Sequence, residues 1–210
     1  TFHNLSNGQH TLYIKVSDAN NRESLAFIDV TVDTSLTLSD FSIDPISAQV
    51  AGVPFSITIK AIDQNGDLYG AFNGTVNLSD LSGSIAPTVT ARFVNGVWTG
   101  SVTITKAIED NSIVVEYNSI HASSNPFVVS HNTFDHFEFA PITTQAVNVL
   151  FNVTLMAKDA YGNTVTSYSG DVVLDDSTHT ITPTSVSVVD GVCSGKVKIA
   201  TAADGVKITA

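Results

Sequence analysis

Basic residues are scarce in this 210-residue chain, which has nine Lys and Arg against 20 Asp and Glu. The net charge of −11 repels the phosphates of nucleic acids and the surfaces of anionic membranes. Cysteine occurs once, as Cys193, so an internal disulfide cannot form. No apolar run approaches the roughly 18 residues of a membrane-spanning helix. We therefore expect no nucleic-acid partner, no disulfide and no membrane span in this segment.

Motifs that carry catalysis are also lacking, because the sequence has no zinc-protease helix motif, phosphate-binding glycine loop, dinucleotide fingerprint or serine-centred elbow. The stretch 191–195 has the outline of a nucleophile elbow with Cys193 at its apex. An internally repeated stretch, 96–100, has Trp98 at the same place, and both stretches continue as alternating strands. We interpret Cys193 as a core thiol and predict that the chain is not an enzyme.

An internal repeat organises the chain, with a match at an offset of 96 residues that becomes 95 after one deletion. The matches extend along the whole unit, as in a duplicated module. They include Phe41 with Phe137, Pro45 with Pro141, Gln49 with Gln145, Asp63 with Asp159, Gly66 with Gly162, Ile85 with Ile181, and Gly100 with Gly195.

The repeat divides the chain into three predicted parts. Residues 34–130 form one complete domain, and residues 131–210 form a second domain without its last strand. Residues 1–33 are too few to fold alone and are expected to be the closing hairpin of an upstream domain. We interpret the chain as a segment cut from a longer tandem array; the alternative is strand exchange, in which a neighbour supplies the absent strand.

Every element is predicted to be a β-strand, because apolar residues alternate with polar ones along 55–61 and along the equivalent 151–157. Further alternating rows cover 72–78 and 98–104, and Asn95-Gly96 and Asp190-Gly191 are hairpin signals between strands. No window has a helical period. The first copy holds about seven short strands in about 95 residues, which indicates an all-β fold of antiparallel two-sheet sandwiches.

Several of these motifs resemble a known family. Asn7 to Leu12, Asp18 to Asn21 and the closing Val30 to Asp33 look like the last two strands of a bacterial immunoglobulin-like domain. The segments 61–67 and 157–163, with Asp-x-x-Gly followed by Asp or Asn, resemble the invasin-type (Big) immunoglobulin-like tandem repeats of bacterial and archaeal cell-surface proteins. The resemblance implies tandem immunoglobulin-like sandwiches in adhesins, surface layers, sheaths or spacers of secreted hydrolases.

The loop with Asp63, Asn65 and Asp67 has the one-three-five spacing of a calcium loop. Its sixth position is Leu68 instead of glycine, and its twelfth is Gly74 instead of glutamate. We therefore interpret it as a turn stabilised by Asp and Gly.

Carboxylates near the predicted domain junctions are the better candidates for a cation, because Ca²⁺ prefers oxygen ligands. A possible interdomain calcium site would use Asp33, Asp40, Asp44, Asp135 and Glu138. The alternative is a solvated acidic surface. His131, Asp135 and His136 are too few to predict zinc and are interpreted as linker polarity, and no other cofactor is predicted.

Asn-x-Ser/Thr sequons begin at Asn4, Asn73, Asn77 and Asn152, and the last three are expected to face outward from their strands. These asparagines are candidate glycosylation sites in an extracellular setting. Trp98 shares the inward parity of its strand and is expected at a core edge.

We predict a structural segment of an extracellular cell-surface protein, as a surface layer, sheath or adhesin stalk. Its expected partners are copies of the same protein in a lattice or filament. One alternative is a receptor- or glycan-binding adhesin module, with Tyr69 and Tyr161 as candidate tip aromatics. Another is a spacer in a secreted polysaccharide-degrading enzyme.

Overall fold

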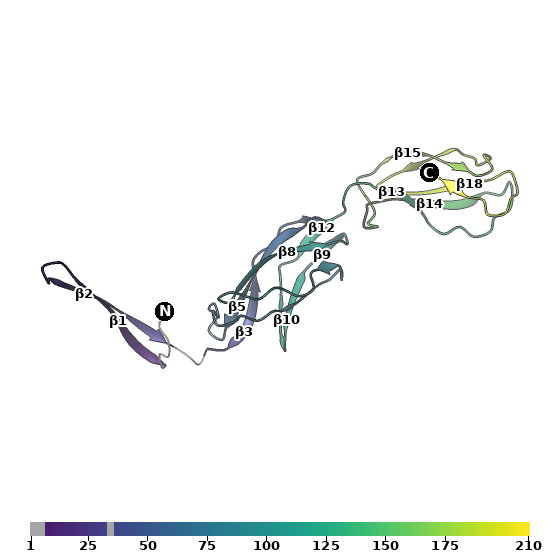
Figure 1. Ribbon diagram of the computed structural model, residues 1–210. Coiled ribbons are helices and arrows are strands. Elements are labelled where there is room, and N and C mark those ends of the chain that lie inside the picture. Colours follow the sequence, from purple (N-terminus) through teal and green to yellow (C-terminus); the bar gives the residue numbers. More distant parts are fainter. Residues whose placement is uncertain (1–6, 33–35) are drawn as a thin grey trace.

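The computed structural model describes residues 7–32 and 36–210, and Figure 1 shows them as a hairpin followed by two groups of strands. Every regular element in these two ranges is a β-strand. The strands are β1 (Gly8–Ser17), β2 (Glu23–Val32), β3 (Leu38–Ile43), β4 (Gln49–Val50), β5 (Phe55–Asp63), β6 (Asn77–Asp80), β7 (Ile85–Ala86), β8 (Val97–Ile104), β9 (Ile108–Asn111), β10 (Ile113–Tyr117), β11 (Ile120–Ser123), β12 (Phe127–Ser130), β13 (His136–Phe139), β14 (Phe151–Lys158), β15 (Gly170–Val173), β16 (Asp175–Asp176), β17 (Ser185–Val188), β18 (Val192–Val197) and β19 (Ile208–Thr209).

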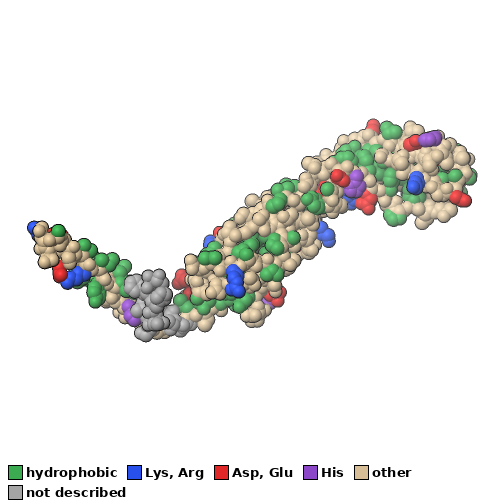
Figure 2. Space-filling model, in the orientation of Figure 1, with side chains coloured by type: hydrophobic (Ala, Val, Ile, Leu, Met, Phe, Trp, Pro, Cys, Tyr) green, Lys and Arg blue, Asp and Glu red, His purple; other side chains and the backbone are tan. Residues whose placement is uncertain are grey.

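The hairpin pairs β1 with β2 in antiparallel register from Gly8 opposite Val32 to Ser17 opposite Glu23. At its turn, Asp18 Oδ1 accepts hydrogen bonds from the backbone N–H groups of Asn20 and Arg22, both at 2.8 Å. Its apolar side chains are mostly exposed, and Figure 2 shows them along its length. A two-stranded sheet with so little burial has little stability of its own.

The first sandwich contains β3 to β12, in the sheet orders β3-β5-β8-β7, β11-β10-β6 and β4-β12-β9. Alternate residues of β5 and β8 face inward, including Ile57, Ile59 and Trp98, as their period of two predicts. Opposite sheets meet across this core, where the rings of Phe41 in β3 and Tyr117 in β10 lie 6.3 Å apart. The pairs are antiparallel except β4 with β12, which is parallel.

The second sandwich contains β13 to β19, in the sheet orders β13-β14-β18, β15-β17 and β16-β19. Its core is a separate cluster of buried residues that includes Val153, Leu155, Leu174, Cys193 and Val197. The prediction of an all-β fold made of antiparallel sandwiches is confirmed. Among the described residues there is no helix long and apolar enough to cross a membrane.

The predicted hairpin turns have the backbone angles that were expected, whereas one predicted strand begins later in the structure. Asn95, Gly96, Asp190 and Gly191 have φ angles of 51°, 76°, 50° and 78°, as two-residue hairpin turns with positive φ require. The row predicted along 72–78 becomes a strand only at Asn77, because the preceding backbone makes scattered bonds instead of a continuous ladder. Those bonds run from Phe93 N–H to the Gly74 carbonyl (2.9 Å) and from Thr90 N–H to the Val76 carbonyl (3.0 Å).

Candidate functional site at the junction of the two sandwiches

The connection between the sandwiches, residues 131–135, contacts both of them. Asn132 donates from Nδ2 to the Ala51 carbonyl of the first sandwich and from its backbone N–H to Asp159 Oδ2 of the second, both at 2.8 Å. The Phe134 ring lies 4.8 Å from the ring of Phe137 and 4.9 Å from that of Tyr168, measured between centroids. A short connection fixed at both ends restricts bending between the sandwiches.

Asp159 organises the loop that follows β14, which we call the Asp159 loop (residues 159–163). Its Oδ1 accepts hydrogen bonds from the backbone N–H groups of Tyr161 and Asn163, both at 2.9 Å, and so closes an Asx-type turn. Gly162 has the positive φ of +82° that this turn requires. Its Oδ2 accepts from Asn132 N–H and from Asn163 Nδ2. One buried carboxylate therefore joins the loop to the connection.

The four donors also control the charge of Asp159. Burial raises its pKa, but the hydrogen bonds from Asn163, Asn132 and Tyr161 outweigh burial and hold the pKa below its usual range. The carboxylate is therefore ionised at neutral pH although its residue is completely buried.

Asn163 connects this loop to the first sandwich with both ends of its side-chain amide. Its Oδ1 accepts from Ala107 N–H and its Nδ2 donates to the Thr105 carbonyl, both at 2.9 Å. Thr105 and Ala107 lie directly after β8. Because an amide offers one acceptor and one donor group, it matches the N–H and the carbonyl of this backbone segment.

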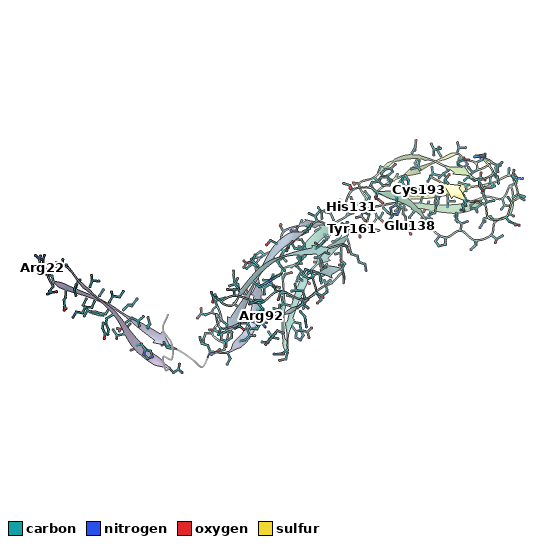
Figure 3. All side chains as sticks on the ribbon, viewed as in Figure 1. Arg22, Arg92, His131, Glu138, Tyr161 and Cys193 are labelled. Atoms are coloured by element: carbon teal, nitrogen blue, oxygen red, sulfur yellow. The ribbon has the colours of Figure 1, made fainter. Side chains whose placement is uncertain are left out.

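Tyr161, at the tip of the same loop, packs against the first sandwich at Gly52. Gly52 lies in the turn after β4 (residues 50–53), which we call the Gly52 turn, and has a φ of +76°. A Cβ placed on Gly52 would lie 2.0 Å from Tyr161 Cε2 and 2.2 Å from its hydroxyl oxygen. Figure 3 shows Tyr161 and His131 where the two sandwiches meet. The absence of a side chain at residue 52 is therefore what admits the ring.

The equivalent loop of the first sandwich, residues 63–67, has the same Asp-stabilised turn but not the residues that contact a neighbouring sandwich. Asp63 Oδ1 accepts from the N–H groups of Asn65 (2.8 Å) and Asp67 (3.0 Å), so the predicted Asp-stabilised turn is confirmed. This loop has Asn65 and Asp67 where the second has Tyr161 and Asn163. The turn is common to both copies, whereas the residues that reach the neighbouring sandwich are not.

The carboxylates predicted as calcium ligands are held by other partners. Asp33 lies outside the described residues, and the others lie on or beside β3 and β13. The partners are Phe41 N–H for Asp40 (2.7 Å), Lys60 for Asp44 (2.6 Å), His136 for Asp135 (2.8 Å) and Lys158 for Glu138 (3.7 Å). Over 7–32 and 36–210, no group of three or more His, Cys, Asp or Glu side chains is placed to hold a metal ion. Calcium binding stays a prediction.

His131 in the connection and His136 at the start of β13 contact separate partners. His131 Nδ1 lies 2.8 Å from the Asn132 carbonyl, and His136 Nδ1 lies 2.8 Å from Asp135 Oδ2. Both contacts are between neighbours in sequence, as expected for the polarity of a linker.

Asn73, Asn77 and Asn152 are exposed, as predicted for glycosylation sites, and Asn4 lies outside the described residues. Exposure makes these three asparagines accessible, and their modification stays a prediction.

Cys193 and Trp98 are buried in the second and first cores, as predicted. Burial raises the pKa of the Cys193 thiol, which keeps it protonated and unreactive.

Two buried aspartates at equivalent positions, Asp80 and Asp176, were missed by the sequence patterns. Asp80 Oδ1 accepts from the N–H groups of Ser84 (2.8 Å) and Ile85 (2.9 Å), and its Oδ2 from Asn111 Nδ2 (3.0 Å). Asp176 is 2% exposed, and its Oδ1 accepts from the N–H groups of Thr180 and Ile181 in the equivalent turn. A signal existed, since both aspartates are followed by Ser or Thr two and four residues later.

Comparison with solved structures finds surface-protein modules. Domains 5-6 of the S-layer protein SbsC match at 14% identity and a TM-score of 0.35, over 79% of this chain and 85% of that one. The Escherichia coli adhesin FdeC matches at 18% identity and a TM-score of 0.42, over 94% of this chain and 68% of that one. SbsC domains 4 and 5 match at 18% identity and a TM-score of 0.35, over 51% of this chain and 63% of that one.

This chain spans about a third of the longer SbsC structure of domains 1-6. No family model matches the sequence, and no curated protein matches it. At these identities and TM-scores, a likeness does not transfer a function.

Proposed function

We propose that this chain is a structural segment of an extracellular cell-surface protein, in which the sandwiches are stiffly linked beads of a stalk, sheath or surface layer. The observation that supports this proposal is the junction. Asn132, Asp159 and Asn163 connect the linker, the second sandwich and the backbone of the first through hydrogen bonds of 2.8 to 2.9 Å. A linker that only tethered two independent domains would need none of these bonds.

The module assignment is part of the same proposal. We assign residues 34–130 and 131–210 to two domains of the invasin-type immunoglobulin-like kind, and 1–33 to the end of an upstream one. The separate hydrophobic cores and the Asp-centred turns of both sandwiches support this division. An array of such modules is extended in one dimension, which suits a protein that must reach outward from a cell.

The tip aromatics give little support to a glycan-binding module. Tyr161 packs on Gly52 of the neighbouring sandwich, and Tyr69 is partly buried against the first core. Stacking on a sugar needs an accessible ring face, and both tyrosines already contact protein, although Tyr161 is 46% exposed. The structural role is therefore the better supported of the two.

The stiffness of the junction is testable in this chain by pulsed electron–electron double resonance, which measures the distance between nitroxides attached at Ser79→Cys and Ser185→Cys. These exposed serines lie on β6 of the first sandwich and β17 of the second, and the buried Cys193 stays unlabelled. We expect one narrow distance distribution. A broad distribution would overturn the stiff junction.

Location is tested separately by immunogold labelling of intact cells that produce the protein. Gold confined to the outer surface is expected, and labelling only after permeabilisation contradicts the proposal. Electron microscopy of the same material, with calcium and then with chelator, tests the association of copies into a lattice or filament. Separate rods under both conditions overturn that part.

We further propose glycosylation at Asn73, Asn77 and Asn152, supported by their exposure. The intact mass of the protein from its native source should exceed the mass of the polypeptide by glycan increments at these asparagines. A mass equal to the bare polypeptide removes this proposal.

A further inference from the structure

The Gly52 turn has a structural counterpart in the second sandwich, at residues 146–149. Gly52 N–H donates to the Ile104 carbonyl at 2.8 Å, and Asn148 N–H donates to the Ile199 carbonyl at 2.9 Å. Each turn is closed by a further backbone bond, from Val53 to Val50 and from Val149 to Ala146. The φ angles of Gly52 and Asn148 are +76° and +59°. The two turns therefore share a backbone conformation and differ in the side chain at its centre.

This difference decides what each turn can accept. At the Gly52 turn, the Tyr161 ring occupies the space that a Cβ would fill. Its Cε2, Cζ and hydroxyl oxygen all lie within 2.2 Å of the ideal Cβ position. Asn148 has that Cβ and a whole amide beyond it. A contact below 3 Å between carbon atoms is strongly repulsive, so the Tyr161 ring could not keep this position if residue 52 carried a Cβ. A tyrosine-bearing loop therefore fits the Gly52 turn and clashes at the Asn148 turn.

The Asp-centred loops of the two sandwiches, residues 63–67 and 159–163, differ at the positions that contact the neighbouring sandwich. The loop of the first sandwich has Asn65 at the position of Tyr161, and Asp67 at the position of Asn163. An aspartate there offers only acceptors, so it could not donate to a carbonyl in the way that Asn163 donates to Thr105. Neither the Asn65 loop nor the Asn148 turn carries the residues that form this junction.

We propose that the pair Gly52 and Tyr161 determines which module can follow which, and that the Asn148 turn excludes loops with an aromatic tip. The partner that fits the Gly52 turn is thus an Asp-x-Tyr-Gly-Asn loop, as at 159–163. The inference rests on the proposed stiff junction, because selectivity has meaning only if the junction forms in solution. Order along an array would then be set by steric exclusion at each turn as well as by attraction.

The test uses the spin-labelled pair of residues 79 and 185 in the 210-residue chain. Gly52→Asn copies the Asn148 turn, and asparagine tolerates the positive φ at this position, as Asn148 itself does. We expect its distance distribution to shift and broaden. The double variant Gly52→Asn with Tyr161→Asn removes the ring and should restore a narrow distribution near the original distance. Asn148→Gly, the matched control in the other turn, should leave the distribution unchanged.

The outcomes separate the two proposals. A broad distribution in the unsubstituted chain overturns the stiff junction and with it the selectivity. A narrow distribution that survives Gly52→Asn overturns the selectivity alone, as does broadening that Tyr161→Asn fails to relieve. An effect of Asn148→Gly equal to that of Gly52→Asn also counts against the pair. Amide spectra with the dispersion of both folded sandwiches confirm that each variant reports on the junction and not on unfolding.

Discussion

Replacing Asn163 by alanine should open the junction without unfolding either sandwich. The change removes two hydrogen bonds to the first sandwich, from Ala107 N–H and to the Thr105 carbonyl, and one internal bond to Asp159. A typical hydrogen bond contributes about 0.5–1.5 kcal/mol net, so the two junction bonds together contribute about 1–3 kcal/mol. Since 1.4 kcal/mol is about a factor of ten, the closed state should lose about 5-fold to 150-fold in stability relative to the open state.

Hydrogen exchange measured by NMR reads this loss at the bond itself, because Ala107 N–H is the donor. Because Asn163→Ala removes the acceptor of this N–H, its protection against exchange should be lost, and the opening of the junction should broaden the distance distribution between spin labels at residues 79 and 185. Gly52 N–H bonds to the Ile104 carbonyl within the first sandwich and should keep its protection. The matched control is Asp67→Ala, the equivalent position of the other loop, which should leave Ala107 unchanged. Unchanged protection of Ala107 in Asn163→Ala would refute the reasoning.

The remaining predictions concern the buried groups and the cation. Asp80→Ala should lower the unfolding free energy in urea by about 3 kcal/mol, because it leaves buried donors of Ile85 and Asn111 unsatisfied, whereas exposed Ser79→Ala should change it little. The pKa values of Asp80, Asp159 and Asp176 are all lowered by folding, so the folded state binds fewer protons. Their stabilisation should be complete above the ordinary pKa of 3.8 and disappear as the pH falls through the lowered pKa values. An acid-unfolding curve in which stability increases as the pH falls through this window contradicts the prediction. Cys193 should react slowly with a thiol reagent in the native chain and rapidly in urea, and equal rates would show that it is not buried. Calorimetric titration with Ca²⁺ tests the ligand set of Asp33, Asp40, Asp44, Asp135 and Glu138, and the absence of heat and of a change in melting temperature removes it.

The sequence predicted the parts of the fold that depend on local pattern. The alternation of β5 and β14 places Ile57, Ile59, Val153 and Leu155 in the cores, because a strand turns successive side chains to opposite faces. Strand limits were harder to predict. The row after Phe72 has the correct inward parity, yet its backbone bonds irregularly to residues 90–93, and hydrophobic pattern carries no information about such bonds.

The hydrogen bonds across the junction could not be predicted from the sequence for a related physical reason. Asp159 Oδ1 bonds to residues two and four positions ahead, and a spacing rule detects that. Its Oδ2 bonds to Asn132, 27 residues earlier, and Asn163 reaches back 56 residues to Ala107. Contacts at such separations are set by how two folded modules dock, and no local periodicity encodes them.

The repeat itself contains the missing signal, in the positions where its copies differ. Identical positions such as Asp63 and Asp159 serve needs that both sandwiches share, and here that need is the turn. Residues that contact a neighbour must match that neighbour, and the neighbours of the two copies are different. Gly52 against Asn148, and Asn65 against Tyr161, are differences of this kind. In a tandem array the shared residues therefore indicate the fold of each module, and the differing residues at turns and loop tips indicate how one module joins the next.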